Sequence, residues 1–233
     1  MISVCIATYQ GEKYIREQLA SILCQLDDDD EIIVSDDGST DRTLDIIRQM
    51  ADHRIKIVEG PHRHSPTLNF ERALQEARGD YIFLADQDDV WKPDKVQVCM
   101  QWLKHYSCVV SDAEVTDHQL RLLHPSLYAL MGVRPGRLYN TVWKNGYTGC
   151  CMAFRRNVLE ASLPFPQDIP MHDIWIGNVA AYQYNVKFIS EKLVLFRRHD
   201  HVISCNGKGS RFSLCQKIKF RINTIYHVIR LFV

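Results

Sequence analysis

Short apolar runs alternate with amphipathic segments along the first 112 residues of the chain. Each run is short enough for a buried strand, and the segment after it repeats its apolar residues at helical intervals. Strands are therefore expected at residues 2–8, 31–35, 55–58, 81–85 and 108–111, and helices at residues 12–24, 41–50, 67–77 and 93–104. This alternation predicts an α/β fold with a Rossmann-like, mostly parallel sheet flanked by helices.

The regular alternation ends near residue 113. Residues 118–145 contain two prolines and two glycines, which indicate a variable loop region. Further along we expect a strand at 148–154, a helix at 173–182, and short strands at 186–190 and 193–197. Residues 213–233 place apolar side chains at helical intervals with basic residues between them, which predicts an amphipathic basic helix.

Polar clusters follow three of the expected strands. They are Thr8-Tyr9, Asp36-Asp37-Gly38 and the acidic run Asp86-Gln87-Asp88-Asp89. Parallel α/β sheets bind ligands at the carboxyl ends of their strands. We therefore expect the three clusters to converge on one site.

The acidic run at residues 86–89 has two interpretations. Carboxylates spaced one residue apart at a strand end can bind one Mg²⁺ or Mn²⁺, which then bridges to phosphate oxygens. The alternative is a solvated turn whose aspartate caps the next helix. Because the run follows the buried residues 82–85, we favour the metal site.

Three further groups have both a structural and a functional interpretation. Asp36 either shapes an Asp-Gly type turn or accepts hydrogen bonds from a nucleoside. Asp173 either caps the start of a helix or acts as a general base. The basic segment at 197–201 is either a solvated loop or a source of cations and an imidazole for a diphosphate and its metal.

Charge is unevenly distributed along the 233 residues. The net charge is zero, so no nucleic acid partner is expected, yet residues 187–233 carry +8 and the preceding residues −8. The eight cysteines have no metal-site spacing, and we expect reduced thiols in a cytoplasmic protein. For the helix at 211–233 we weigh packing on the body or a dimer partner against peripheral contact with the inner face of the cytoplasmic membrane, and slightly favour the membrane.

The motifs at residues 8–11, 35–41 and 79–91 together resemble family 2 glycosyltransferases of the GT-A fold. The Asp-Gln-Asp-Asp-Val-Trp form at 86–91 is similar to bacterial rhamnosyltransferase-like members that build surface polysaccharides. The resemblance covers roughly residues 1–205. It implies a nucleotide-sugar-binding half at 1–112, an acceptor-binding half at 113–205, and a C-terminal extension at 206–233.

The resemblance also implies a role for each matching residue. Asp173 would be the catalytic base, and Asp88 and His199 would bind Mn²⁺ or Mg²⁺. The remaining matching residues would bind the substrates, from the nucleoside pocket to the diphosphate. They are Thr8, Tyr9, Glu12, Asp36, Asp86, Asp89, Trp91, Arg197 and Arg198.

The predicted activity is an inverting transfer of a sugar such as rhamnose or galactose from a UDP- or dTDP-sugar. The acceptor would be a hydroxyl of a glycan or of a lipid-linked molecule. A nucleotidyltransferase is the first alternative, but residues 9–13 make a poor phosphate loop. A non-catalytic sugar-nucleotide-binding protein is the second, and the presence of Asp36, Asp88 and Asp173 argues against it.

Overall fold

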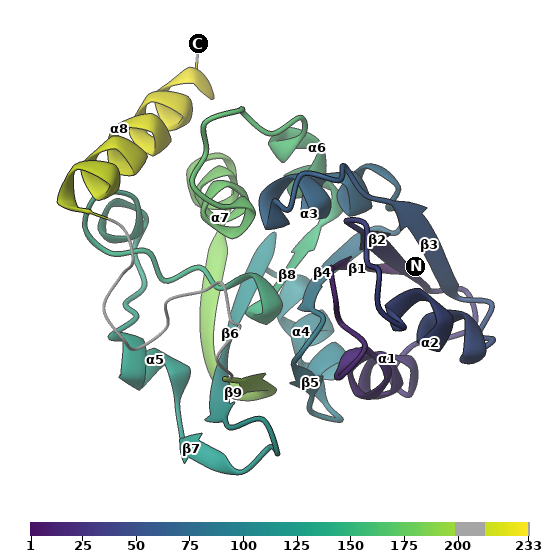
Figure 1. Ribbon diagram of the computed structural model, residues 1–233. Helices are drawn as coiled ribbons and strands as arrows, with labels where there is room; N and C mark the ends of the chain where they lie inside the picture. The colour runs from purple at the N-terminus through teal and green to yellow at the C-terminus, as the bar shows by residue number, and fades with distance from the viewer. Residues whose placement is uncertain (199–212, 233) are drawn as a thin grey trace.

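The computed structural model describes residues 1–198 and 213–232. Its strands form one sheet in the order β3-β2-β1-β4-β8-β6-β9-β5, with β7 paired to β6 at one side (Figure 1). The strands are β1 Ile2–Thr8, β2 Glu31–Asp36, β3 Ile55–Glu59, β4 Tyr81–Asp86, β5 Val90–Trp91, β6 Cys108–Thr116, β7 Leu122–His124, β8 Met152–Arg155 and β9 Val186–Arg197.

Helices cover both faces of this sheet. α3, α6 and α7 lie on one face, and α1, α2 and α4 lie on the other (Figure 1). The bounds are α1 Ile15–Leu23, α2 Thr43–Gln49, α3 Pro66–Gln75, α4 Lys95–Leu103, α5 Leu127–Met131, α6 Arg156–Ser162, α7 His172–Gln183 and α8 Leu214–Arg230, with a π-helix η1 Tyr139–Trp143 and a 3₁₀ turn η2 Gly149–Cys151.

The predicted parallel sheet is confirmed for β3, β2, β1 and β4, which all pair in parallel. The second half is mixed, because β8 runs antiparallel between β4 and β6. The bounds of three expected strands were wrong. The strand expected at 148–154 begins as the turn η2, and the strands expected at 186–190 and 193–197 are the single strand β9. The polar residues 190–192 interrupt the apolar pattern without interrupting the strand.

The region at 118–145 is more ordered than its sequence suggested. It contains β7, α5 and η1. Ser126 caps α5 by accepting from the backbone N–H of Ala129, and Gly132 ends that helix in the left-handed conformation. The local signals were therefore caps rather than markers of an irregular loop.

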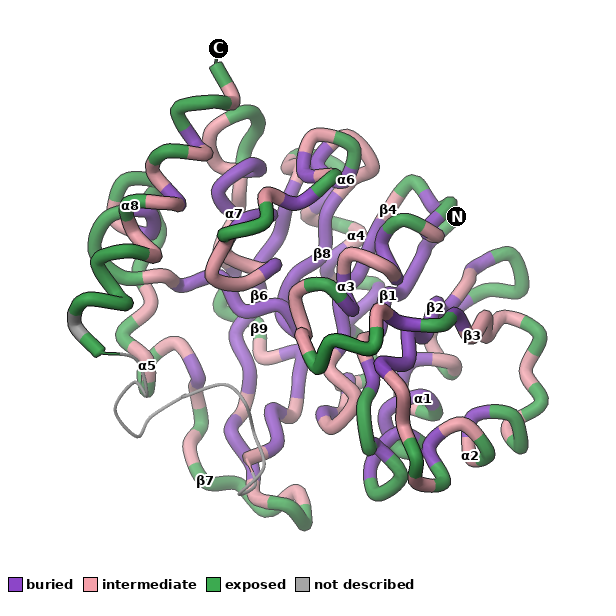
Figure 2. Tube along the Cα trace, turned by 45° about the horizontal axis from the view of Figure 1, so that its top comes forward, coloured by how far each residue is buried: buried purple, intermediate pink, exposed green. Residues whose placement is uncertain are grey.

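The core lies in the middle of the sheet, where the strands are buried (Figure 2). Ile6, Ile33 and Phe83 are completely buried there. Each such side chain contributes roughly 1.5–3 kcal/mol through the hydrophobic effect. The strand register places Thr8 beside Asp36 and Ala7 beside Asp86, so the three polar clusters share one edge of the sheet, as predicted.

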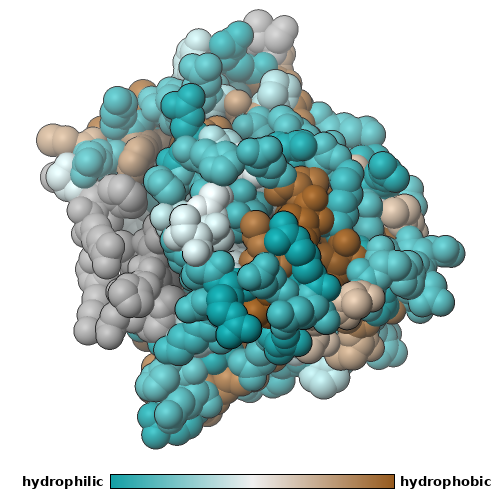
Figure 3. Space-filling model, turned by 45° about the vertical axis from the view of Figure 1, so that its right-hand side comes forward, coloured by the Kyte–Doolittle hydropathy of each residue, from teal (hydrophilic) through white to brown (hydrophobic). Residues whose placement is uncertain are grey.

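The surface differs between the two halves of the molecule. The face toward β3 and α2 is mostly hydrophilic around one compact hydrophobic area (Figure 3). Most of the large apolar side chains that are more than half exposed belong instead to residues 138–143 and to α8 and its end. None of the described helices combines the length and apolarity needed to cross a membrane.

Helix α8 packs on the body through polar contacts. A capping box formed by Ser213 and Gln216 starts the helix. Further along, the Arg221 guanidinium donates to the carbonyls of Asn140, Thr141 and Trp143. The body-packing interpretation of this helix is thus part of the fold, and the expected membrane contact stays a prediction.

Gly177 on α7 has no room for a side chain. A Cβ at this position would overlap the ring of Tyr147, which is itself buried. Alanine normally stabilises a helix interior over glycine by roughly 0.5–1 kcal/mol. We expect Gly177→Ala to lower the free energy of unfolding instead, by about 1–3 kcal/mol, because the site becomes overpacked. Urea denaturation measures the change.

Tyr147→Leu provides the control for this clash. The double variant with Gly177→Ala should lose less stability than the sum of the two single variants, because the smaller side chain makes room for the new methyl group. Strictly additive losses would contradict the clash.

Candidate active site

Gln87 joins the ends of β1 and β4. Its Oε1 accepts from Thr8 Oγ1 at 2.6 Å and from the backbone N–H of Tyr9 at 3.0 Å. Its Nε2 donates to the Tyr9 carbonyl at 3.1 Å. A Cβ on Gly11 would overlap the Gln87 amide, so the close approach requires glycine there. The sequence did not predict this role, because the spacing of the acidic residues around position 87 indicates a metal site and assigns no function to the glutamine between them.

Asp36 is buried and fixed by its own turn. Its Oδ1 accepts from the backbone N–H groups of Gly38 and Ser39, and its Oδ2 accepts from Ser39 Oγ at 2.5 Å. Asp37 holds the next loop by accepting from the backbone N–H groups of Arg63 and Ser65. The turn interpretation therefore describes the local structure, and the predicted contact of Asp36 with a nucleoside stays a prediction.

Two of the expected pocket residues lie at the surface beside this turn. Tyr9 is 39% exposed and its ring lies 4.6 Å from the His64 ring, measured between centroids. This leaves an aromatic face available at the rim. Glu12 is also exposed, and its carboxylate accepts from the backbone N–H of Arg42 at the start of α2.

Two residues of the acidic run, the half-buried Asp86 and the buried Asp89, form a cluster with Cys150. Ligand atoms of Asp86, Asp89 and Cys150 all lie within 4.8 Å of one another, and among the described residues this is the group suited to a metal. Oδ1 of Asp89 accepts from the backbone N–H of Arg197, whereas its buried Oδ2 has no hydrogen-bond partner. A cation would satisfy that oxygen.

Burial and like charge disfavour ionisation of both carboxyls in this cluster. Burial, followed by the charges of Asp88 and Asp173, raises the pKa of Asp86 to about 7. Burial, followed by the charges of Asp88 and Asp86, raises the pKa of Asp89 well above its usual range. A bound cation reverses this penalty, because it favours the ionised forms.

The cluster fits Mn²⁺ or Mg²⁺, which prefer carboxylate oxygens and complete their coordination with phosphate oxygens and water. The Cys150 thiol is a weaker candidate ligand, since its pKa lies well above the usual range. The predicted ligand Asp88 is half-buried and is not a member of the group. The second predicted ligand, His199, lies outside the described residues.

Arg197 holds the acidic loop in place through hydrogen bonds to Asp88 and Asp89. It is 3% exposed, and its guanidinium donates to the carbonyls of Asp88 and His118 and to Glu17 Oε2 at 2.5 Å. The guanidinium of Arg197 is therefore buried in this structure, and its predicted contact with substrate stays a prediction. Arg198 is half-buried, and its backbone N–H donates to the Thr116 carbonyl.

Trp91 also lies beneath the site. It is 3% exposed, and its ring packs against Phe83 with 5.6 Å between centroids. Lys95 is completely buried beside it, with Nζ 4.9 Å from the Trp91 ring centroid and 2.8 Å from the Cys150 carbonyl. The Lys95 charge partly offsets the raised pKa of Asp86. Nothing in the sequence around Lys95 signalled this position.

Asp173 lies in the first turn of α7. Its Oδ1 accepts from the backbone N–H of Ile174 at 2.7 Å, and its Oδ2 accepts from that of Gly149 at 3.2 Å. Burial raises its pKa to about 6, against the lowering effect of these two hydrogen bonds. Because its charge also raises the pKa of Asp86, the two carboxyls belong to one site. A carboxylate of this kind can accept a proton near neutral pH.

His172, the residue before Asp173, is a buried and neutral histidine. Its ring is buried, stacks on Phe70 with 4.0 Å between centroids, and has no hydrogen-bond partner at either nitrogen. Burial lowers its pKa to about 3, so the ring is neutral. The histidine therefore adds no charge beside the carboxylate.

Residues 3–163 match the family described as glycosyl transferase family 2. The chain is 28% identical to the dTDP-rhamnosyl transferase RfbG of Shigella flexneri, over 92% of this chain and 77% of that protein. It is 27% identical to an uncharacterised glycosyltransferase of Nostoc sp., over 85% of this chain. The match spans only 65% of the length of that relative.

Two solved structures share the fold. TarS of S. aureus, residues 1–349 in complex with UDP-GlcNAc, matches with a TM-score of 0.71 at 20% identity, over 99% of this chain and 64% of that one. Glucosyl-3-phosphoglycerate synthase of Mycobacterium tuberculosis, in complex with Mn²⁺, UDP and phosphoglyceric acid, matches with a TM-score of 0.59 at 21% identity, over 99% and 78%. These likenesses confirm the predicted GT-A fold.

Replacing one of the clustered carboxyls tests the cation site. At pH 8, without divalent cation, we expect Asp86→Asn to raise the melting temperature, by about 2–4 °C for each kcal/mol of relieved repulsion. The folded-state pKa of Asp86 is raised to about 7, so its ionisation destabilises the fold as pH rises from about 4 to 7. The gain should therefore vanish at pH 4. Differential scanning calorimetry measures both values.

Mn²⁺ completes the test. It should raise the melting temperature of the wild-type protein more than that of Asp86→Asn, because the variant has lost a ligand. The exposed Asp28→Asn is the matched control and should behave as wild type. Equal Mn²⁺ shifts in all three proteins would argue against a cation at this cluster.

Proposed function

The chain belongs to glycosyl transferase family 2, and on that premise we propose that it transfers a sugar from a nucleoside-diphosphate donor to a hydroxyl group, with inversion at the anomeric carbon. One observation carries the proposal. A buried acidic cluster suited to a cation lies beside Asp173, a carboxylate whose raised pKa of about 6 suits a general base. Diphosphate binding and proton removal thus have separate groups in one site.

The donor we propose is a UDP- or dTDP-sugar. TarS is described with UDP-GlcNAc, and RfbG is named as a dTDP-rhamnosyl transferase, which supports this donor class. The nucleoside would lie at the ends of β1 and β2, with the base against the exposed ring of Tyr9. Gln87 keeps the Tyr9 backbone in place through two hydrogen bonds. The transferred sugar that we propose is rhamnose, galactose or a similar sugar.

Asp86, Asp88 and Asp89 would hold Mn²⁺ or Mg²⁺ in this proposal. The mycobacterial neighbour described with Mn²⁺ supports a divalent cation. A bound cation supplies positive charge that offsets the charge of the departing diphosphate. The chain's own contribution is to fix the loop, because Arg197 binds the Asp88 carbonyl and the Asp89 carboxylate from below.

Asp173 would remove the proton from the acceptor hydroxyl as the hydroxyl oxygen attacks the anomeric carbon. The backbone N–H groups of Gly149 and Ile174 fix the orientation of its carboxylate. Burial makes it a stronger base than an exposed aspartate, yet it remains ionised at neutral pH. We propose that the acceptor is a glycan, free or carried on a lipid, in surface polysaccharide assembly; the name of one relative, WfgD of Escherichia coli, gives a diphosphoundecaprenol-linked sugar as its acceptor.

Asp173→Asn tests the base. Release of nucleoside diphosphate from the sugar donor should slow by roughly 10²–10⁴-fold, because the amide cannot accept the proton. The KM for the donor should stay within about twofold, since the base contacts the acceptor. In the wild type, kcat/KM should fall as pH drops below about 6, where Asp173 becomes protonated. A variant that keeps this acid limb, or full turnover, would rule out Asp173 as the base.

Asp88→Ala tests the donor side separately. Calorimetric titration with UDP or dTDP in the presence of Mn²⁺ should show metal-dependent binding to the wild type and none to the variant, because the acidic loop has lost a carboxylate near the cation. Asp94→Ala is a suitable control, since Asp94 is exposed just beyond the loop. Unchanged binding by Asp88→Ala would remove Asp88 from the metal site.

A further inference from the structure

Helix α8 has one apolar stripe that the body of the protein does not cover. Ile218, Ile222, Ile229 and Phe232 recur at intervals of three, four or seven residues, which places them along one side of a helix. Each is more than half exposed. The buried contacts of the helix use another side, through Val228 and Thr224.

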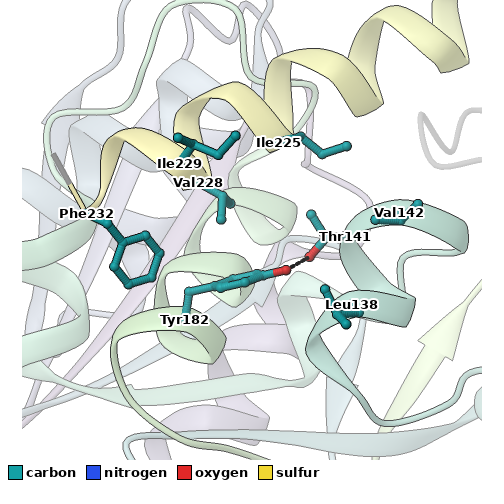
Figure 4. Close-up of a pocket in the computed structure, with 8 residues that line it drawn as sticks. All are labelled: Leu138, Thr141, Val142, Tyr182, Ile225, Val228, Ile229 and Phe232. Atoms are coloured by element: carbon teal, nitrogen blue, oxygen red, sulfur yellow. Dashed lines mark hydrogen bonds between the residues drawn. The ribbon is translucent and has the colours of Figure 1, made fainter.

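The η1 segment extends this stripe into a wider surface. Leu138, Val142 and Trp143 are 67%, 55% and 77% exposed. Between η1, α7 and α8 lies a groove of about 340 Å³ lined almost entirely by apolar atoms, with Leu138 and Val142 on one side and Phe232 on another (Figure 4). The hydrogen bond from Thr141 Oγ1 to the Tyr182 hydroxyl, 3.2 Å long, lies at its floor. We define the apolar face as Leu138, Val142, Trp143, Ile222, Ile229 and Phe232.

The two segments that form the apolar face carry charge of one sign, and Asp168, which lies outside them, pairs with His227 of α8. Neither residues 134–146 nor residues 213–232 contain an aspartate or glutamate. The same two segments contain seven cations, of which Arg221 is tied to the η1 carbonyls. The exposed ones flank the apolar face: Arg134, Arg137, Lys144, Lys217, Lys219 and Arg230.

We propose that the apolar face docks on an anionic lipid bilayer, with its side chains entering the acyl region and the flanking cations binding headgroup phosphates. This arrangement is that of an interfacial amphipathic helix, widened here by η1. A second copy of the chain is a poorer occupant, because two surfaces with an excess of positive charge would face each other. An exposed tryptophan at the edge suits the boundary between headgroups and acyl chains.

Docking through the apolar face would bring the bilayer close to Asp173. Tyr182 lines the groove and belongs to α7, the helix whose first turn holds Asp173. At 1.5 Å per residue, the two residues are about 13 Å apart along the helix axis. A bilayer against the apolar face would thus lie close to the base. The docking itself is independent of the proposed transfer reaction.

Vesicle co-sedimentation of the full chain tests the proposal. Vesicles with equal parts of phosphatidylglycerol and phosphatidylcholine should bind the protein at least about tenfold more tightly than pure phosphatidylcholine vesicles, because several cations contribute. High salt should weaken the binding. Equal binding to both kinds of vesicle, or none to either, would overturn the proposal.

Matched variants separate the apolar and the charged contributions. Trp143→Ser/Ile222→Ser should weaken binding at least about tenfold, since two exposed apolar side chains no longer insert. Leu122→Ser/Leu123→Ser is the control, because these side chains are 59% exposed on β7, away from the apolar face. Lys219→Gln/Arg230→Gln should also weaken binding, whereas Arg48→Gln/Lys104→Gln should not. Equal loss in variant and control pairs would overturn the proposal.

Two further measurements separate membrane docking from misfolding and from dimer formation. Circular dichroism should give the same melting curve for all variants, since every replaced side chain is exposed. Light scattering without lipid should give the same mass for the wild type and Trp143→Ser/Ile222→Ser; a dimer that this variant breaks would assign the apolar face to a second copy instead. Release of nucleoside diphosphate from soluble donor should be unchanged, so a failure here is distinguishable from a failure of the proposed reaction.

Discussion

The mutual repulsion of two carboxyls, the half-buried Asp86 and the buried Asp89, is the constraint on which the rest of the site depends. Both have pKa values raised by burial and by the charge of Asp88. The surrounding chain provides fixed compensation from two directions. The backbone N–H of Arg197 binds Asp89, and the buried ammonium of Lys95 lies below the cluster. This compensation is partial, because one oxygen of Asp89 has no partner, and the remainder is what a cation would supply.

The short turn η2 connects the buried Lys95 with the proposed base, Asp173, through hydrogen bonds. Lys95 Nζ donates to the Cys150 carbonyl in η2, and the neighbouring Gly149 N–H donates to Asp173. The turn is closely packed, since a Cβ on Gly149 would press against the neutral ring of His172. A lysine can be buried here because its ammonium donates to the Cys150 carbonyl, lies over the Trp91 ring and is near the Asp86 carboxyl, whereas an isolated charge would be costly.

The parts of this arrangement that sequence reasoning predicted are those with local signals. The strand ends, the acidic run and Asp173 at a helix start each appear within a few neighbouring residues. Arg197 was predicted to touch substrate, yet it is buried against Glu17, 180 positions away in the chain. Gln87 pairs with Thr8 across 79 positions, and Lys95 with Cys150 across 55. No periodicity or motif records such partners, because only the folded sheet brings them together.

The two proposals together would account for the uneven charge of the chain, because each gives the protein an anionic ligand that is bound in a different way. In the proposed reaction the donor's diphosphate would meet an acidic cluster, so it would require a cation between the two. An anionic bilayer would meet lysine and arginine directly, so it requires no metal. If basic side chains like those around α8 surrounded Asp86, they would pair with the carboxylates and displace the cation. Placing the cations of α8 and η1 away from Asp86 would keep the acidic cluster available for the proposed metal, with α7 between the two surfaces.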